Sequence, residues 1–292
     1  MGGGLGATSL YVSEIMMKKI IFLSIVLISF LLNAQESDIE LNTVLMNSTF
    51  RIEGSGKTGT VFIIGKPSKK DTSKAYYVLV TANHVLDDIK TDNATIFLRK
   101  ESNNNITKLP YTIKVRTNGK PLWIKHPDSD VAVMYIALPT EIKFTLIPTL
   151  FLATDSLITE YEIHPGDELL CLGFPYGAEA NNFGFPILRS GKISSYPITP
   201  TKVIKSFLFD FQVFGGNSGG PVYFVGLNRK YKGGINIGEV RFIIGLVSEE
   251  LVVEEQVKSL SEISIKKHPL SLARVIPAVF IKEAIDLLPS LE

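Results

Sequence analysis

The chain contains very little cysteine: Cys171 is the only one among 292 residues. A single thiol excludes a disulfide within the chain, so stability depends on a packed core. We interpret Cys171 as a small buried hydrophobic residue, because no motif around it indicates a thiol nucleophile. Charge of one sign is also lacking, since 30 basic and 29 acidic residues leave a net charge of +1. This balance gives no indication of a nucleic acid or an anionic membrane surface as a partner.

No apolar run in the N-terminal region reaches the length of a membrane span, which needs about 20 residues. Residues 20–32 form a 13-residue apolar run, preceded by "MMKK" at 16–19 and followed by Ala34. A basic start, a short apolar run and a small residue are typical of a secretory signal peptide. We therefore expect a signal peptide within residues 1–34, with an upstream extension at 1–15, and a secreted or periplasmic protein without a stable membrane span after cleavage. An uncleaved anchor is the alternative.

After residue 40 the sequence consists of short runs rich in Val, Ile, Phe and Tyr, separated by turn residues. This pattern predicts an all-β sandwich or barrel. One amphipathic helix is expected at 275–291, and the charged stretch 249–274 is interpreted as a long loop or a packed connector. The expected strands lie within residues 59–65, 75–82, 94–99, 111–116, 131–138, 168–174, 205–213, 221–225 and 241–248.

The segment "GSGKT" at 54–58 is similar to a phosphate-binding loop but lacks part of that pattern. The full pattern needs a glycine five positions before the Gly-Lys pair, and Arg51 occupies that position. The segment also leads into a β pattern, whereas a phosphate-binding loop opens a helix. We therefore predict a tight turn before a strand and no nucleotide binding.

The segment "GGNSGGPV" at 215–222 surrounds Ser218 with glycines and is the strongest candidate for a nucleophile. A serine hydroxyl needs a neighbouring base, and that base needs an orienting partner. His84 ends an apolar β run, which would bring it to the rim of a sheet. Asp130 is the last polar residue before the run at 131–138, which suits a partly buried carboxylate that orients an imidazole. Asp128 is the nearby rival and is expected to be solvated.

The remaining three histidines each precede a proline in a polar context. For this reason we expect them to be exposed or locally bonded residues of loops, without a catalytic role. They are His126, His164 and His268.

The motifs "TANHV", "DSDVAVM" and "GNSGGPV" resemble the His, Asp and Ser motifs of trypsin-like serine proteases, in that family's order. The asparagines before His84 and Ser218 and the segment "GFPYG" are most similar to the bacterial HtrA-like branch. The resemblance covers roughly residues 45–250 and implies two six-stranded antiparallel β-barrels with the active site between them. The implied division is an N-terminal barrel at 40–152, a C-terminal barrel at 153–250, and a connector with a helix at 251–292.

The resemblance also implies roles for the residues around Ser218. The backbone N–H groups of Gly216 and Ser218 would form an oxyanion hole, which stabilises the negative charge of acyl transfer. Gln212 would lie at the base of the primary substrate pocket. Ser248, Glu249 and Glu250 would belong to its wall, where the glutamates either favour basic substrates or form a solvated rim. No cofactor and no metal ion is implied.

The chain departs from the digestive proteases of this family at Asn217. Those enzymes have an aspartate there, which pairs with a newly cut N-terminus, so the resemblance implies no activation by that route. The residues after 250 are too few for the peptide-binding PDZ domain that HtrA-like relatives usually carry. The leading hypothesis is therefore an exported serine endopeptidase acting on proteins or peptides. The alternative is a protease-like binding or regulatory protein without turnover.

Overall fold

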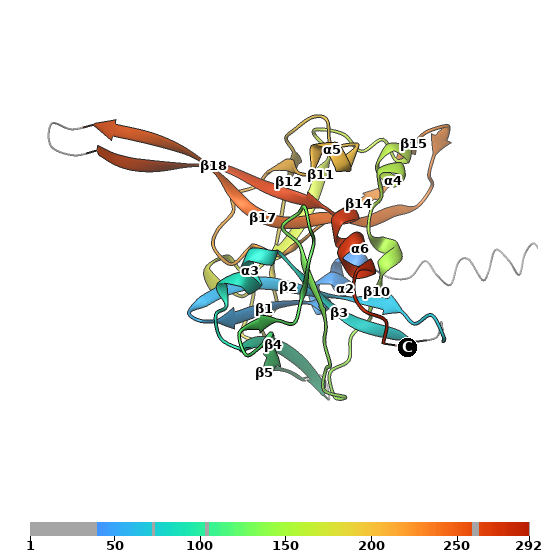
Figure 1. The fold of residues 1–292 in the computed structure, drawn as a ribbon. Helices are drawn as coiled ribbons and strands as arrows, with labels where there is room; N and C mark the ends of the chain where they lie inside the picture. The colour runs from blue at the N-terminus through green and yellow to red at the C-terminus, as the bar shows by residue number, and fades with distance from the viewer. Residues whose placement is uncertain (1–39, 72–73, 103–104, 259–262, 292) are drawn as a thin grey trace, which may run out of the picture. The chain divides into compact units, whose positions relative to one another are not determined.

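The computed structural model describes residues 40–71, 74–102, 105–258 and 263–291 (Figure 1). Residues 41–292 form one compact unit, which contains all of the elements described below. The expected signal peptide at 1–34 lies outside the described residues. Within the described ranges, no helix is both long enough and apolar enough to span a bilayer. Each of the nine strand segments expected from the sequence contains a strand.

The N-terminal part of this unit is built mainly from antiparallel strands. Its elements are α2 (Leu41–Ser48), β1 (Thr49–Gly54), β2 (Lys57–Pro67), β3 (Ala75–Thr81), α3 (Asn83–Asp88), β4 (Asn93–Ser102), β5 (Asn105–Lys114), β6 (Arg116–Thr117), β7 (Lys120–Pro121), β8 (Ile124–Lys125), β9 (Ala132–Tyr135) and β10 (Ile147–Pro148), followed by the 3-10 turn η1 (Thr149–Phe151) and α4 (Asp155–Glu160).

Eight of these strands form one sheet in the order β5-β4-β1-β2-β3-β9-β8, with β10 parallel to β2, and β6 pairs separately with β7. The first of the two expected barrels is therefore not closed by the strand pairings of the described residues. Strand β5 ends the sheet and has the features of an edge strand: Pro110 lacks an N–H donor, and Lys108 and Lys114 add charge. We call the eight-stranded sheet the first sheet.

The C-terminal part contains the closed barrel. Its elements are β11 (Glu168–Gly173), the 3-10 turn η2 (Pro175–Gly177), β12 (Ile187–Ile193), α5 (Thr201–Ile204), β13 (Phe207–Asp210), β14 (Pro221–Leu227), β15 (Lys230–Tyr231), β16 (Gly234–Ile235), β17 (Glu239–Lys258), β18 (Ile263–Pro277) and α6 (Ala278–Asp286). Six of the strands close in the order β11-β12-β13-β18-β17-β14, and β18 extends this barrel beyond the expected end at residue 250. Its interior includes the fully buried rings of Phe209 and Phe242.

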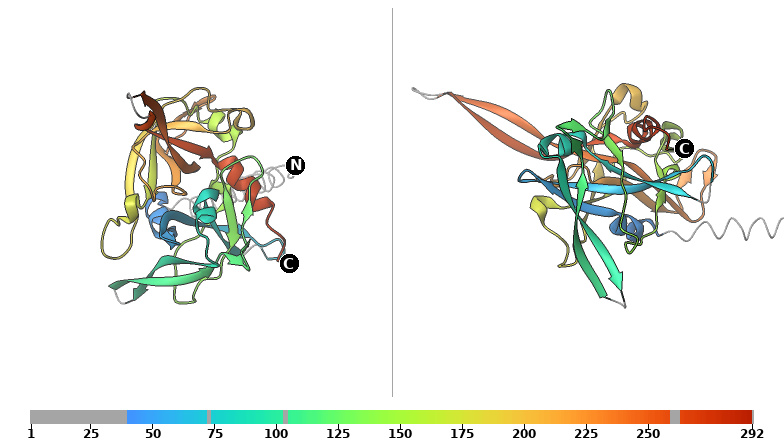
Figure 2. Two further views of the ribbon diagram at one scale, coloured as in Figure 1. Left: turned by 60° about the vertical axis from the view of Figure 1, so that its left-hand side comes forward. Right: turned by 60° about the horizontal axis from the view of Figure 1, so that its bottom comes forward.

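The expectation of a loop or connector at 249–274 is wrong. Strands β17 and β18 pair from Gly245 opposite Pro277 out to Lys258 opposite Ile263, so the segment is a long hairpin. Figure 1 and the right-hand view of Figure 2 show that the outer part of this hairpin projects beyond the barrel. The alternation of glutamate pairs with Leu and Val at 249–256 concealed the strand, because cross-strand ion pairs satisfy the charges.

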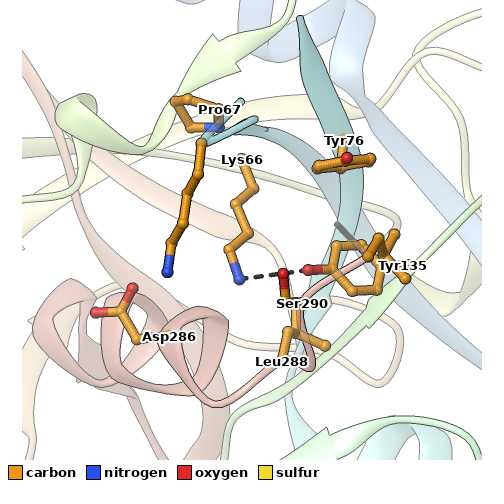
Figure 3. A pocket seen from close by; sticks show the side chains of 9 residues that line it. Lys66, Pro67, Tyr76, Tyr135, Asp286, Leu288 and Ser290 are labelled. Atoms are coloured by element: carbon orange, nitrogen blue, oxygen red, sulfur yellow. Dashed lines mark hydrogen bonds between the residues drawn. The ribbon is translucent and has the colours of Figure 1, made fainter. Parts of the chain in front are cut away.

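The C-terminal helix is shorter than the expected 275–291, because Val275–Pro277 complete strand β18. The residues after α6 lie against the first sheet, where a small pocket of about 70 Å³ is found (Figure 3). Lys66 donates hydrogen bonds to the Ile285 carbonyl at 3.0 Å and to the Tyr135 hydroxyl at 3.3 Å. Tyr135 in turn donates to the Pro289 carbonyl at 2.9 Å. These contacts fix the end of the described chain.

The segment 54–58 forms the turn between β1 and β2, as predicted, and opens no helix. Ser55 and Gly56 have φ values of 51° and 72°, the combination found in two-residue hairpin turns. The Ser55 hydroxyl accepts a hydrogen bond from the Lys90 backbone N–H at 2.9 Å. The glycines of the segment 54–58 therefore allow this tight turn.

Candidate active site

His84 is the second residue of α3, directly beyond the end of β3. The helix that carries it is fixed by the buried Asn83, whose Oδ1 accepts a hydrogen bond from Trp123 Nε1 at 3.0 Å. Asn83 Nδ2 also donates to Asp87 at 2.8 Å. The asparagine before the histidine thus sets the position of α3, a role that the resemblance alone did not reveal.

Asp130 lies just before β9 and accepts two hydrogen bonds from His84. The His84 backbone N–H donates to Asp130 Oδ1 at 3.0 Å, and His84 Nδ1 lies 2.8 Å from Asp130 Oδ2. The expected pairing of these two side chains is therefore present. Asp128, the rival, is exposed and donates only its backbone N–H to His126.

Ser248 donates a third hydrogen bond to the same carboxylate, from Oγ to Asp130 Oδ2 at 2.6 Å. Burial on its own would raise the pKa of Asp130, but the hydrogen bonds from His84 and Ser248 and the His84 charge lower it to about 2. The carboxylate therefore stays ionised over the whole physiological range.

The His84 imidazole responds in the opposite direction. Burial would lower its pKa, but the hydrogen bond and charge of Asp130, with smaller contributions from Asp88 and Glu249, raise the pKa above 6.5. Since Nδ1 bonds to Asp130, Nε2 carries the lone pair of the neutral ring. The side chain is 43% exposed, so this nitrogen can be reached from solvent.

Ser218 lies in the loop between β13 and β14, half-buried. Its backbone is fixed on the first sheet, because the Thr60 N–H donates to the Ser218 carbonyl at 2.9 Å. A Cβ at the next residue, Gly219, would lie 2.1 Å from Thr81 Oγ1 and 3.1 Å from the backbone N of Ala82, two residues before His84. The loop of Ser218 therefore packs against the segment that leads into α3. Among the described residues, the His84 hydrogen bonds go to Asp130, and none joins His84 to the Ser218 hydroxyl.

Two peptide groups of this loop are held by hydrogen bonds to their carbonyl oxygens. The Gly215 carbonyl accepts from the Tyr176 N–H at 2.5 Å, and the Asn217 carbonyl accepts from the Gly220 N–H at 3.0 Å. Because a trans peptide holds its N–H opposite its carbonyl, these bonds direct the N–H groups of Gly216 and Ser218 the other way. An oxyanion hole needs two such N–H groups that lie free of partners from their own loop.

Gly216 is restricted to glycine by its backbone. Its φ is +100°, and an added Cβ would lie 2.2 Å from the Phe174 carbonyl oxygen. Its own carbonyl accepts a hydrogen bond from the buried Thr60 hydroxyl at 2.6 Å. Thr60 is a residue that the sequence analysis missed, since a threonine within an apolar strand carries no signal of this contact.

The residues expected at the substrate pocket occupy four different settings. Gln212 is exposed, and its backbone carbonyl accepts a hydrogen bond from Arg189 Nη1 at 2.7 Å. Glu249 is exposed and pairs with Arg274 at 2.8 Å, and Glu250 is half-buried. Ser248 is buried, and its hydroxyl is engaged by Asp130. Ser248, one of the expected wall residues, thus contacts the Asp130 carboxylate.

The loop after η2 is joined to the first sheet by ion pairs around Glu179. Glu179 Oε1 lies 3.1 Å from Arg51 Nη2, and Glu179 Oε2 lies 2.7 Å from Lys108 Nζ. Further along this loop, Arg99 donates to the Gly184 carbonyl at 2.5 Å. Burial lowers the pKa of Arg99 to about 9, and Glu179 opposes this shift. These charges hold the loop that follows η2, the turn that carries Tyr176, the donor to Gly215.

The other histidines are not part of the site. His164 is exposed, with Nδ1 3.7 Å from Asp167 Oδ2, as expected. His268 lies in strand β18 and pairs with Glu255 at 2.8 Å, so its assignment to a loop is wrong. His126 is not exposed: it is buried and bonds to Glu283 of α6 at 3.0 Å, while its Nδ1 accepts the local hydrogen bond from the Asp128 N–H at 3.2 Å.

Cys171 is fully enclosed in β11, and burial raises the pKa of its thiol to about 12. The interpretation of Cys171 as a buried hydrophobic residue is confirmed. In the part of the chain that the structure describes, no group of three or more His, Cys, Asp or Glu side chains is arranged to hold a metal ion.

Comparison with known proteins identifies one family. Residues 58–224, more than half of the chain, match the family model described as "Trypsin-like peptidase domain". No curated protein sequence matches the chain.

Among solved structures, an inactive form of a serine-to-alanine variant of Rv3671c from M. tuberculosis is 15% identical. The matched region covers 86% of this chain and 90% of the Rv3671c chain, with a TM-score of 0.41. The thermostable serine protease AL20 from an extremophilic microorganism is 12% identical over 82% of this chain and 95% of its own, also with a TM-score of 0.41.

Proposed function

Because the chain belongs to the trypsin-like peptidase domain family, we propose that it is a serine endopeptidase that forms an acyl-enzyme on Ser218. The observation that carries the proposal is the double hydrogen bond from His84 to Asp130. It fixes both the position of the imidazole and its tautomer, which are the two tasks of the acid in this chemistry. The family match and the glycine-rich loop of Ser218 add support.

In the proposed reaction the Ser218 Oγ attacks the scissile carbonyl while His84 Nε2 takes the hydroxyl proton. The new Oγ–C bond gives a tetrahedral intermediate, and the protonated His84 is stabilised by the ionised Asp130. His84 then returns the proton to the leaving amine as the C–N bond breaks. Water repeats the sequence on the acyl-enzyme, which releases the carboxylic acid and restores Ser218.

We assign the stabilisation of the oxyanion to the N–H groups of Gly216 and Ser218. Their partners on the opposite side of each peptide, Tyr176 and Gly220, support this assignment. Loss of one such donor typically costs about 2.7–4 kcal/mol of transition-state stabilisation. We also propose Gln212 as the base of the primary pocket. A neutral amide there lacks the charge that selects lysine or arginine, so neutral residues should precede the cleaved bond.

The proposal is tested by labelling with a fluorophosphonate, which reacts only with an activated serine. Wild-type protein should be labelled stoichiometrically and should cleave unfolded casein, and Ser218→Ala should do neither. Ser194→Ala is the matched control, since this serine is exposed and its hydroxyl donates to the Lys192 carbonyl. Absence of labelling in folded wild-type protein would contradict the proposal and favour the protease-like binding protein.

We also propose that the protein is exported, with support from the basic, apolar and small residues at 16–34. Expression with the native N-terminus should give a mature form outside the cytoplasm that begins near Gln35. The N-terminus of the purified protein, read by mass spectrometry, checks this. An intact chain that stays in the cytoplasmic fraction would refute export without affecting the proposed chemistry.

A further inference from the structure

His126 is a buried histidine that the proposed reaction does not use. Its side chain is 5% exposed, and its ring packs edge-on against Phe280 of α6, with 5.1 Å between the ring centroids. In the sequence it stands four residues before Asp130, the carboxylate that holds the His84 imidazole. A buried polar ring needs partners for its nitrogens, so those partners indicate what His126 does.

The first partner is the turn that leads to Asp130. His126 Nδ1 accepts a hydrogen bond from the Asp128 backbone N–H at 3.2 Å. The backbone of His126 closes the same turn, because its N–H donates to the Val131 carbonyl at 2.9 Å. Residues 126–131 are therefore tied together twice by His126, once through its ring and once through its backbone, and Asp130 lies within this closed turn.

The second partner is the C-terminal helix. His126 Nε2 lies 3.0 Å from Glu283 Oε2. Because a backbone N–H can only donate to Nδ1, the proton of the neutral ring lies on Nε2 and is donated to the carboxylate. Burial alone would raise the pKa of Glu283, but the hydrogen bonds from Lys202 and His126 lower it. Glu283 therefore accepts this bond as an ionised carboxylate.

Glu283 is itself fixed from the barrel. Lys202 Nζ of α5 lies 2.6 Å from Glu283 Oε1 and 2.7 Å from Oε2, so it contacts both oxygens. The same Nζ lies 5.6 Å from the centroid of the Phe280 ring, against which His126 packs. A continuous series of contacts thus joins α5, the carboxylate of α6, the His126 ring and the turn before β9. Through it, a residue of the barrel restrains the turn that carries Asp130.

We propose that His126 is a positioning residue for Asp130, because it fastens the turn 126–131 to the C-terminal helix. This inference rests on the proposed peptidase function, in which Asp130 orients His84. The carboxylate is also held by the Ser248 hydroxyl, which donates to Oδ2 at 2.6 Å. Ser248 and His84 bond to the carboxylate itself, whereas His126 acts on the backbone that carries it.

The effect of losing this restraint should appear in turnover. Without the bond from Asp128 the turn is less constrained, although every hydrogen-bond donor to the Asp130 carboxylate is still present. Catalytic groups must be held within about 0.5 Å of their productive geometry, and small displacements lower the rate strongly. We therefore expect a fall in kcat with little change in KM, since contacts with the substrate are untouched.

Two substitutions separate the two bonds of the ring. In His126→Asn the amide oxygen takes the place of Nδ1 and can accept from the Asp128 N–H, while the bond to Glu283 is lost. In His126→Gln the amide nitrogen takes the place of Nε2 and can donate to Glu283, while the bond from Asp128 is lost. Both substitutions remove the ring from Phe280, so the loss of packing is matched.

Steady-state kinetics of the two variants test the positioning role. His126→Gln should lower kcat about tenfold and leave KM within about twofold, as expected for one lost buried hydrogen bond. His126→Asn should keep kcat within about threefold, although both variants lose stability through the missing ring. His164→Asn is the control, because His164 is exposed, and it should match the wild type. Equal kcat values in the two His126 variants, or a lower value in His126→Asn, would overturn the inference.

A substitution at the far end of the series leaves the buried ring in place. Lys202→Met removes the charge that fixes Glu283 and should lower kcat about threefold, with KM unchanged. Lys282→Met is the matched control, since Lys282 pairs with Asp286 on the outside of α6 at 3.2 Å and should leave kcat unchanged. The same kcat in both lysine variants would contradict a restraint that reaches Asp130 through Glu283.

Nuclear magnetic resonance tests the same coupling without turnover. A proton held between His84 Nδ1 and a carboxylate resonates at unusually low field, so its signal reports the geometry of this pair. In full-length Ser218→Ala protein at constant pH, the signal should move to higher field or broaden with His126→Gln and stay unchanged with His126→Asn. The Asp128 amide should exchange at least about tenfold faster in His126→Gln alone.

These measurements stay valid if Ser218 is not a nucleophile, so failure of the proposed chemistry and failure of this inference are distinguishable. A low-field signal that is identical in both variants, while the Asp128 amide exchanges faster in His126→Gln, would show that the turn moves without affecting His84. That result would limit His126 to packing and overturn the inference.

Discussion

Ser248 of the barrel donates its hydroxyl hydrogen to the Asp130 carboxylate of the first sheet, with 2.6 Å between Oγ and Oδ2. The same oxygen, Oδ2, lies 2.8 Å from His84 Nδ1. The carboxylate is thus held from both parts of the fold, and its charge is balanced by donors from each. A small displacement of the barrel relative to the first sheet would loosen Asp130 and, through it, the imidazole.

Loss of the Ser248 hydroxyl should therefore reduce turnover more than substrate binding. We expect Ser248→Ala to lower kcat about tenfold or more, because a hydrogen bond to a charged group contributes about 1.5–3 kcal/mol. The pKa of Asp130 should rise from about 2. Steady-state kinetics on one peptide substrate measure the change, with Ser194→Ala as the control. A rise in KM with an unchanged kcat would instead assign Ser248 to substrate binding.

The pH profile should have its acidic limb above 6.5. His84 acts as a base only when neutral, and its raised pKa means that activity is lost as the pH falls through that raised value. Asp130 does not contribute to this limb, since it titrates near 2. In Asp130→Asn the limb should move to lower pH while kcat falls about 10⁴-fold. The logarithm of kcat/KM plotted against pH tests both statements, and an unmoved limb would contradict them.

Gly216→Ala should abolish most of the activity without unfolding the protein. The new Cβ would meet the Phe174 carbonyl, and φ is +100°, so the peptide must rotate and withdraw its N–H. We expect kcat to fall about 10²–10³-fold. Gly56→Ala is the matched control, because its φ is +72° but no atom lies within 4 Å of its Cβ position. Similar losses of activity in both variants would point to a general effect on folding.

The sequence was sufficient for the nine expected strand segments, which depend on local apolar runs, and its motifs indicated the pairing of His84 with Asp130. It was insufficient for features that depend on distant contacts. The contact of Ser248 with Asp130 joins residues from different sheets. The hairpin beyond Glu249 was hidden because its glutamates are neutralised by residues of the opposite strand, a register that a single sequence does not display. Whether the first sheet closes into a barrel also depends on contacts between its two edge strands, β5 and β8, which are distant in the sequence.

Thiol reagents should leave the enzyme active. Cys171 is buried and its thiol pKa is raised to about 12, so almost no thiolate is present at neutral pH. Incubation with iodoacetamide should not modify the native protein, and Cys171→Ala should retain kcat/KM within about twofold. Mass spectrometry of the treated protein, native and unfolded, provides the measurement. Inactivation that Cys171→Ala prevents would show that the thiol takes part in the reaction.

The ion pairs of Glu179 should matter for turnover because they hold the loop next to η2, whose Tyr176 contacts the segment with the proposed oxyanion donors. Glu179 binds Arg51 and Lys108 on the first sheet, and Tyr176, three residues earlier, fixes the Gly215 carbonyl. Glu179→Gln should lower the fluorophosphonate labelling rate about threefold to tenfold and the free energy of unfolding by about 1.5–3 kcal/mol. Glu53→Gln is the control, since Glu53 also pairs with Arg51 but lies on the same strand, β1. Equal labelling rates in the two variants, with only the stability of Glu179→Gln reduced, would limit Glu179 to a structural role. A slower rate in Glu179→Gln alone would mean that the ion pairs between sheet and loop perform here the ordering that related digestive proteases obtain from a cut N-terminus.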